Sequence, residues 1–493
     1  MYNNNEIRGS RSRPPNETEA FVLEQKELYA ELDRWIAAHK EEYLKDVSDL
    51  VRIPSVATDE PEGDMPFGKA CFDVLQASLA LSEKYGFATK NYDNYCGSAV
   101  YGENEDSIGI VGHMDIVPQG EGWTTDPFQT TISEDGKYIF GRGTADNKAP
   151  ALVGLYAMRF LKDHGIRLRH NIMMVYGCNE EKGMADMPEF LKREKAPVFT
   201  LIPDSKYPVG YYEMSMFDVT LVSPKLDGNL KDLWAGLAVN AESPKAYAVL
   251  CGLDAAAAEK ALAGREKLWA EDVDGGVKVW AEKDANEGKE SPVTALHRLC
   301  GALVDTGLAT GNGRAALDYI RRVSVDKKGT GFGIACRDEI VGDMLSRCSF
   351  VRVEDGAIVF RPDIRYPVLV DWKGIKENLD RSVEASPFTM THFANNPGQY
   401  ISLEHPVVQK LMEISREMLG QPDIEPIATY GGSYARKLPN AVTYGVTVPG
   451  RVRLFGFEKG GAHQADEYGD INNLMLNIKI YVRTLMEIDE ILD

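Results

Sequence analysis

The sequence predicts an α/β domain with a mostly parallel central sheet that is interrupted by an inserted α+β domain. Three observations support this prediction. Short apolar runs alternate with helical patterns between about residues 70 and 205. From about residue 212 to 398 the strand-like runs alternate apolar and polar residues, as half-exposed antiparallel strands do. After residue 398 the first pattern returns, so the middle segment is an insertion.

The first half of the predicted α/β domain alternates helices with buried strands. Apolar residues recur at helical spacing over residues 20–50, and a stretch rich in Ala, Leu and Met predicts a helix at 150–162. Continuous apolar runs predict buried strands at 107–111, 172–176 and 198–202. The alternation of helices and strands favours a largely parallel sheet.

The inserted segment has a different pattern. Alternating residues predict antiparallel strands at 219–222 and 277–280, and Ala-rich stretches predict helices at 254–268 and 293–303. The glycine-rich residues 329–333 lack the context of a dinucleotide-binding fold and predict a turn. Beyond the insertion, helices at 406–419 and 472–492 complete the α/β domain.

The length of 493 residues exceeds the size of a single hydrophobic core, so more than one domain is expected. We predict a disordered lead-in at 1–19, a first part of the α/β domain at 20–212, the insertion at 213–398, and a second part of the α/β domain at 399–493.

Composition excludes several classes of function. A net charge of −20 argues against nucleic acid or an anionic membrane as the main partner. No window approaches 18 apolar residues and residues 1–19 are polar, so neither a membrane span nor a signal peptide is expected. Seven cysteines without a Cys-x-x-Cys pair fit a reducing cytoplasm and provide no thiolate metal site.

Candidate metal ligands follow three of the predicted strands. His113 and Asp115 come after the first strand, Glu180 and Glu181 after the second, and Asp204 after the third. In an extended backbone His113 and Asp115 share a face, and an Asp beside a ligating His is a usual orienting partner. Two of these segments have an ordinary alternative when taken alone. His113 could be a capping His in a turn, and the paired glutamates could be a solvated charge run.

Two further segments supply candidates of the same chemistry. Asp146 lies in a glycine-rich loop before a helix, where it could instead be the helix N-cap. His463 belongs to a His- and acid-rich segment near residue 465. Imidazoles and carboxylates are the ligands that zinc prefers, so the fold is predicted to gather them into a two-metal hydrolytic centre.

Five blocks in this order resemble the signatures of the di-zinc aminoacylase and carboxypeptidase superfamily of metallopeptidases. They are residues 112–118, 141–146, 179–183, 203–204 and 462–468. Two more, residues 363–367 and 430–436, resemble the peptidase V branch, which includes Xaa-His (carnosinase-type) and staphylococcal-type dipeptidases. The resemblance spans roughly residues 45 to 490.

This resemblance implies a role for each matching residue. His113 and Asp204 would hold one zinc ion, Glu181 and His463 the second, and Asp146 would bridge both. Glu180 would be the general base and later the acid, with Asp115 orienting His113. A hydroxide that bridges two Zn²⁺ ions, for which Mn²⁺ or Co²⁺ could substitute, would attack the peptide carbonyl of an unblocked dipeptide.

The same resemblance implies that the insertion is a lid that contributes to substrate binding. Arg365 would bind the C-terminal carboxylate of the substrate, and Gly432 and Ser433 would offer backbone N–H groups to the same carboxylate. Asn240 would lie near the reacting carbonyl. In the peptidase V branch the lid is doubled, which implies that the protein is a monomer. We also expect it to act in the cytoplasm, on small peptides.

The chain departs from the family pattern in the lid. The block that usually carries an oxyanion-stabilising histidine has Asn286 as the nearest counterpart, and His297 lies on a predicted helix. Asn147 and Ala149 also replace a common Asp and Gly. Two alternatives to a dipeptidase therefore stay open: a deacylase or amidase acting on N-acyl or modified amino acids, and a metal-binding pseudoenzyme that captures peptides without turnover.

Overall fold

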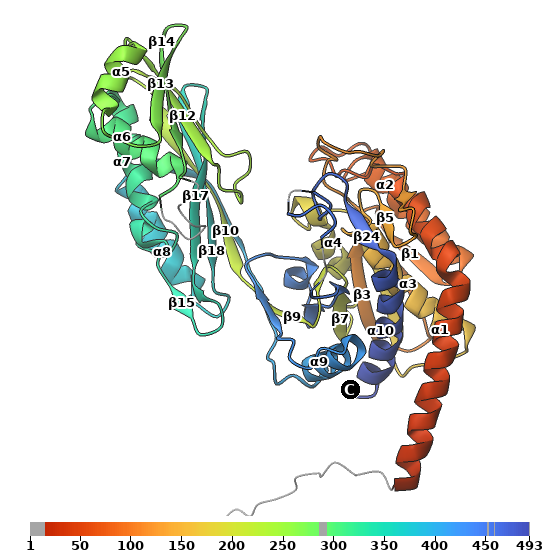
Figure 1. The fold of residues 1–493 in the computed structure, drawn as a ribbon. Helices are drawn as coiled ribbons and strands as arrows, with labels where there is room; N and C mark the ends of the chain where they lie inside the picture. The colour runs from red at the N-terminus through yellow and green to blue at the C-terminus, as the bar shows by residue number, and fades with distance from the viewer. Residues whose placement is uncertain (1–14, 285–292, 451–452, 458, 493) are drawn as a thin grey trace, which may run out of the picture. The chain divides into compact units, whose positions relative to one another are not determined.

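The computed structural model describes residues 15–284, 293–450, 453–457 and 459–492, with side chains from Lys26 onward (Figure 1). It divides into two compact units, and each is described by itself. The first contains the chain up to Tyr211, together with Ile401–Ile427 and Ser433–Asp493. The second contains Tyr212–Tyr400 and Ala428–Gly432. Of the lead-in predicted at 1–19, residues 1–14 lie outside the described residues. The remaining residues belong to α1 (Pro15–Val51).

A mixed sheet forms the centre of the first unit. Its order is β1-β2-β6-β3-β7-β22, with parallel pairing from β6 to β22 and antiparallel strands at the flank. These strands are β1 (Ala88–Tyr92), β2 (Cys96–Tyr101), β3 (Ser107–His113), β6 (Asn171–Gly177), β7 (Phe199–Ile202) and β22 (Ala441–Thr443). The order continues through β9 (Gly210–Glu213), in which the chain passes into the second unit. The three predicted buried strands are confirmed as β3, β6 and β7, and so is the α/β class.

Helices and a short 3₁₀ turn cover both faces of this sheet, as a buried parallel sheet requires. One face packs against α1, α2 (Lys69–Lys84), α3 (Lys148–Asp163), α9 (Pro406–Leu419) and α10 (Ile471–Asp489). The other packs against α4 (Asp186–Arg193) and η3 (Tyr434–Lys437). Adjacent residues of a strand point to opposite faces of the sheet. Met174 of β6 accordingly belongs to the apolar core on the first of these faces, and Val175 belongs to the apolar core on the second.

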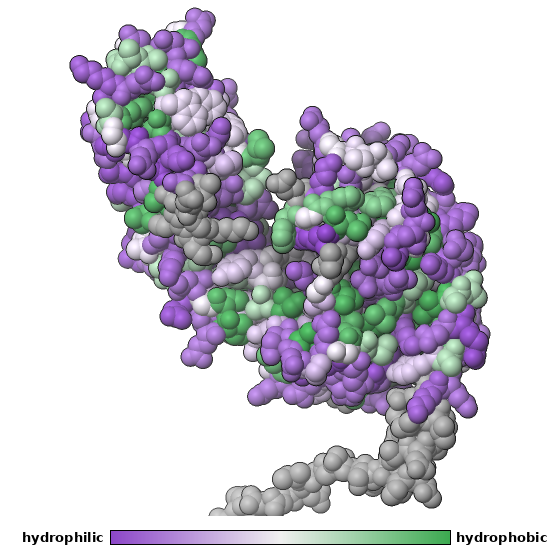
Figure 2. All heavy atoms as spheres, in the orientation of Figure 1, coloured by the Kyte–Doolittle hydropathy of each residue, from purple (hydrophilic) through white to green (hydrophobic). Residues whose placement is uncertain are grey.

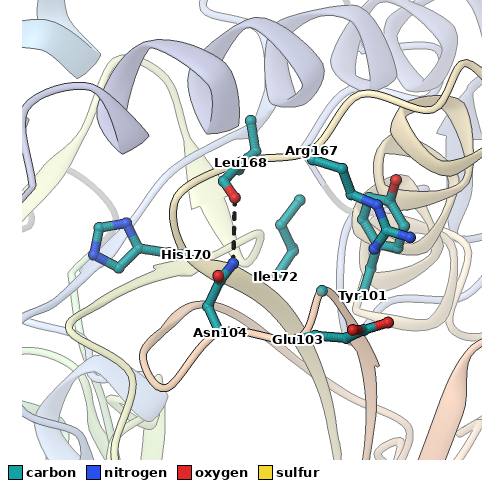
Figure 3. A pocket seen from close by; sticks show the side chains of 8 residues that line it. Tyr101, Glu103, Asn104, Arg167, Leu168, His170 and Ile172 are labelled. Atoms are coloured by element: carbon teal, nitrogen blue, oxygen red, sulfur yellow. Dashed lines mark hydrogen bonds between the residues drawn. The ribbon is translucent and has the colours of Figure 1, made fainter.

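A small cavity of about 320 Å³ lies where β6 begins (Figure 3). Tyr101, Arg167 and His170 are among its lining residues. The Asp489 carboxylate, in the last turn of α10, accepts hydrogen bonds from the backbone N–H groups of Arg169 at 2.8 Å and His170 at 2.9 Å. These bonds tie the end of α10 to the start of β6, at the opposite end of the strand from the candidate metal ligands.

The second unit is an antiparallel sheet with helices on one face. The strand order is β13-β14-β12-β11-β17-β18-β10-β19. In chain order the strands are β10 (Ser215–Lys225), β11 (Leu230–Ala235), β12 (Lys245–Cys251), β13 (Leu268–Val273), β14 (Gly276–Glu282), β17 (Leu345–Glu354), β18 (Ala357–Tyr366) and β19 (Thr389–Asn396). Its core is shared with helices α5 (Ala255–Leu262), α6 (Ala295–Asp305), α7 (Gly311–Val323) and α8 (Trp372–Glu384).

One helix prediction in this unit is wrong. The helix expected at 254–268 ends at Leu262 as α5, and β13 begins at Leu268. Gly264 and Lys267 have φ angles of 79° and 61°, which a right-handed helix does not accommodate. The alanine-rich composition predicts where this helix begins, but the backbone reversal that ends it depends on these two residues.

Hydrophilic side chains cover most of the visible face of the molecule, in keeping with its net charge of −20 (Figure 2). Among the described residues, no helix has the length and apolar composition that a membrane span requires.

Candidate metal centre

The candidate ligands lie at the carboxyl ends of three adjacent parallel strands in the first unit. His113 is the last residue of β3 and pairs in register with Gly177, the last residue of β6. Asp204 follows β7 by two residues. Because the carboxyl ends of parallel strands meet at one edge of a sheet, the fold brings these segments together.

Two imidazole–carboxylate groups share the Asp146 side chain. Its Oδ1 lies 2.9 Å from His113 Nε2, and its Oδ2 lies 3.2 Å from His463 Nε2. Asp204 Oδ2 lies 3.8 Å from His113 Nε2, and Glu181 Oε1 lies 2.8 Å from His463 Nε2. In each group, His113–Asp146–Asp204 and Asp146–Glu181–His463, the possible ligand atoms lie within 4.8 Å of one another.

This donor set suits two divalent cations. Each group offers one imidazole nitrogen and carboxylate oxygens, the mixture that zinc accepts in catalytic sites. Asp146 directs one oxygen to each group, as a bridging carboxylate must. The alternative that Asp146 is a helix N-cap is wrong, because Asn147 occupies the N-cap position of α3.

Asp115 contacts the two segments that carry the candidate ligands His113 and Glu181, and it is fully buried. Its Oδ1 and Oδ2 accept hydrogen bonds from the backbone N–H groups of Glu180 at 3.1 Å and Glu181 at 3.0 Å. His113 Nδ1 lies 2.9 Å from the Asp115 main-chain carbonyl oxygen and 3.5 Å from its carboxylate. The backbone of Asp115 therefore orients His113, and its carboxylate orients the turn that carries both glutamates.

Burial and neighbouring charges shift the acidity of this cluster. Burial raises the pKa of Glu180 well above its usual range; His113 opposes this effect, while Asp204 adds to it. Hydrogen bonds to Asp146 and Glu181 raise the pKa of His463 to about 10. Although burial acts in the opposite direction, hydrogen bonds with His113 and His463 hold the pKa of Asp146 below its usual range. Burial in this cluster therefore favours the protonated form of Glu180.

The sequence alone indicates no role for Glu467, although it lies in the same segment as His463. It is fully buried, and its Oε1 accepts hydrogen bonds from the backbone N–H groups of Gly143 at 3.0 Å, Ala145 at 2.9 Å and Asp146 at 3.1 Å. Its Oε2 forms an ion pair with the buried guanidinium of Arg142 at 2.5 Å. Glu467 therefore fixes the loop that presents Asp146.

Replacing Glu467 with glutamine is expected to weaken metal binding by about 10–100-fold, the usual cost of removing a partner that supports a metal ligand. A neutral amide no longer balances Arg142 and accepts the three N–H groups less strongly. Competition with a chromophoric chelator for Zn²⁺ measures the affinity. Asp466→Asn is the control, since Asp466 contacts Thr124 and Lys459 instead of the Asp146 loop. Equal affinity in Glu467→Gln and wild type would contradict this role.

Asp186 and Tyr434 form a second supporting pair. Asp186 Oδ2 accepts hydrogen bonds from the backbone N–H groups of Cys178 at 2.7 Å and Asn179 at 3.1 Å, and from the Tyr434 hydroxyl at 2.5 Å. Burial raises the pKa of Asp186 to about 7. A Cβ at Gly177 would lie 2.1 Å from the Tyr434 hydroxyl oxygen, so this close packing requires glycine. Together these contacts hold the turn between β6 and Glu180.

The residues predicted to bind substrate lie in both units. Arg365, in the second unit, donates from Nε to Asp363 at 2.9 Å and from Nη1 to the Tyr430 carbonyl oxygen at 2.5 Å. Asn240 is exposed, and its carbonyl oxygen accepts from Arg347 at 2.6 Å. Gly432 ends the second unit, and Ser433 is the buried N-cap of η3 in the first.

Of the residues considered as an oxyanion donor, Asn286 lies outside the described residues. His297 lies in the first turn of α6, with Nδ1 at 3.0 Å from the Ser324 hydroxyl.

Comparison with known proteins identifies the family. The model of peptidase family M20/M25/M40 matches residues 109–487. The chain is 29% identical over 464 residues to the putative dipeptidase YtjP of Bacillus subtilis (strain 168), covering 91% of this chain and 97% of the relative. It is also 29% identical over 467 residues to the Beta-Ala-Xaa dipeptidase of Lactobacillus delbrueckii subsp. lactis, with coverage of 92% and 97%.

Solved structures agree in fold. Human carnosine dipeptidase 1 superposes with a TM-score of 0.54 at 16% identity, covering 93% of this chain and 99% of the other. The di-peptidase Dug1p of Saccharomyces cerevisiae superposes with a TM-score of 0.56 at 16% identity, covering 93% and 98%. Since the family model spans most of the sequence, including every candidate metal ligand, the chain belongs to peptidase family M20/M25/M40.

Proposed function

We propose that the protein is a di-zinc dipeptidase that cleaves the peptide bond of unblocked dipeptides. The observation that carries this proposal is the Asp146 carboxylate, which faces one imidazole–carboxylate group with each oxygen. Family membership and two relatives named as dipeptidases add support. The protein would act as a monomer in the cytoplasm, and Mn²⁺ or Co²⁺ could replace Zn²⁺.

The proposed ligands are His113 and Asp204 for one cation, Glu181 and His463 for the other, and Asp146 for both. Bound divalent cations lower the pKa of water and polarise a carbonyl oxygen. In this proposal the Glu180 carboxylate accepts the proton of the attacking water and returns it to the leaving amine. Burial raises the pKa of Glu180, which favours the uptake of a proton by its carboxylate. Asp115 holds Glu180 in place for both steps.

Four residues are proposed to bind the substrate. Arg365 would bind the C-terminal carboxylate, because its two internal contacts use only two of the five N–H groups of a guanidinium. Asn240 would donate to the reacting carbonyl oxygen. Gly432 and Ser433 would offer backbone N–H groups to the carboxylate.

The direct test is hydrolysis of an unblocked dipeptide library by the full-length protein with added Zn²⁺, Mn²⁺ or Co²⁺. Free amino acids should appear, chelation should abolish their release, and metal addition should restore it. Mass spectrometry of the intact protein should find two metal ions. N-Acyl amino acids are assayed in parallel. Cleavage of these alone would favour a deacylase, and tight dipeptide binding without products would favour a pseudoenzyme.

A further inference from the structure

A cavity of about 560 Å³ within the second unit is rich in cationic side chains. Its lining includes Glu242, Lys283, Lys327, Leu345, Arg347 and Tyr430. The lysines follow β14 and α7, whereas Leu345 and Arg347 lie on β17. Apart from Tyr430, which lies in the 430–436 block, these residues belong neither to the family signatures nor to the proposed metal centre.

Of the described residues that line the cavity, three are cationic and one is acidic. The Glu242 carboxylate is shared by two ammonium groups, Lys283 Nζ at 2.5 Å and Lys327 Nζ at 2.8 Å. The Asp363 carboxylate is shared in the same way by Arg365 Nε at 2.9 Å and Arg347 Nε at 3.4 Å. Among the described residues, each of these two carboxylates is therefore shared by two cations.

These charges are partly shielded from water. Lys283, Lys327 and Glu242 are each less than one-fifth exposed, and Asp363 is 1% exposed. Like charges held together away from water repel one another more strongly than on an open surface, and an added anion relieves that repulsion. The cavity is thus suited to a carboxylate and unfavourable to a further cation.

The cavity adjoins Arg365 within the same unit. Leu345, which lines it, is the register partner of Arg365 across β17 and β18. Tyr430, which also lines it, accepts a hydrogen bond from Arg365 through its carbonyl oxygen. In a dipeptide, the C-terminal carboxylate and the last side chain branch from the same carbon atom. A substrate held at Arg365 by its carboxylate can therefore direct that side chain to this cavity.

We propose that the cavity accepts the side chain of the C-terminal residue, and that Lys283, Lys327 and Arg347 select substrates in which that side chain is acidic. The preferred substrates are then dipeptides ending in Glu or Asp. This inference rests on the proposed function, through the role of Arg365.

Ala-Glu and Ala-Gln provide a matched test, because their C-terminal side chains are nearly the same size and differ in charge. The wild-type kcat/KM is expected to be about tenfold higher for Ala-Glu, the ratio that one charge-assisted hydrogen bond supplies. Lys327→Gln should reduce this ratio several-fold, and Lys327→Arg should retain it. Lys328→Gln is the control, because Lys328 pairs with Asp343 at 2.6 Å and does not line the cavity. A wild-type ratio near one, or a ratio that Lys327→Gln leaves unchanged, would overturn the inference.

A binding measurement separates this inference from the proposed function. Calorimetric titration of the full-length protein with L-glutamate and with L-glutamine requires no turnover. Tighter binding of glutamate, lost in Lys327→Gln, would support the cavity even if no dipeptide is cleaved. Equal cleavage of Ala-Glu and Ala-Gln would instead leave the dipeptidase standing and refute the selectivity. Circular dichroism of each variant verifies that it is folded.

Discussion

Replacing Glu180 with glutamine is expected to lower kcat by about 10²–10⁴-fold, the range for losing a general acid–base group. The amide keeps the size of the side chain but cannot take a proton from water. The backbone N–H group of Glu180 still donates to Asp115, so the turn and its neighbour Glu181 keep their positions. Metal content should therefore remain at the wild-type value.

Steady-state kinetics with a dipeptide, together with elemental analysis of the same preparation, measures both quantities. Glu189→Gln is the matched control, since Glu189 lies on α4 and pairs with Lys192 and Arg193. Turnover close to wild type in Glu180→Gln would show that another group moves the proton. Loss of metal together with turnover would make Glu180 a ligand.

Replacing Asp146 with asparagine is expected to disturb both metal sites at once. Each carboxylate oxygen faces a different imidazole, and the neutral amide presents one oxygen and one NH₂ group to the two sites. The NH₂ group cannot bind a cation, and the remaining oxygen carries no charge. The loss of activity should exceed the roughly 10–100-fold cost of removing a supporting partner of a metal ligand.

Asp204→Asn is the informative comparison, because Asp204 lies in the His113 group alone. It should lower the occupancy of one site, whereas Asp146→Asn lowers both. Elemental analysis after dialysis counts the ions that each variant retains. Two tightly bound ions in Asp146→Asn would refute a bridging carboxylate.

Much of the fold is encoded locally and could be predicted. The apolar runs at 107–111, 172–176 and 198–202 are strands because a sheet covered on both faces needs continuous apolar sequence. The helix at 406–419 matches α9 because Pro406 begins it and Gly420, at a φ of 63°, ends it. The second unit is predicted less completely. The alternating runs at 219–222 and 277–280 indicate β10 and β14, but no strand is predicted for β11, β12, β13, β17, β18 or β19.

The candidate site likewise contains residues whose position could be predicted and residues whose contacts could not. His113, Glu180, Glu181 and Asp204 each follow an apolar strand, so their position at one edge of the sheet follows from the pattern. The contacts of Glu467 do not follow, because its carboxylate meets backbone groups more than 300 residues away in the chain. The supporting role of Asp186 cannot be predicted from its own segment either, because it depends on the hydrogen bond from the distant Tyr434. Supporting contacts of this kind depend on tertiary structure, and nothing in local sequence identifies them.

The order of the chain has a consequence for biosynthesis. His463 and Glu467 follow the whole of the second unit in sequence, yet they complete a centre whose other members precede it. A ribosome must therefore synthesise the inserted unit before the last proposed metal ligand, His463, and the support of the Asp146 loop become available. Domains generally fold as units during synthesis, so this centre can assemble only after translation has passed residue 467. If the proposed ligand set is right, a nascent chain that does not yet contain His463 cannot hydrolyse peptides.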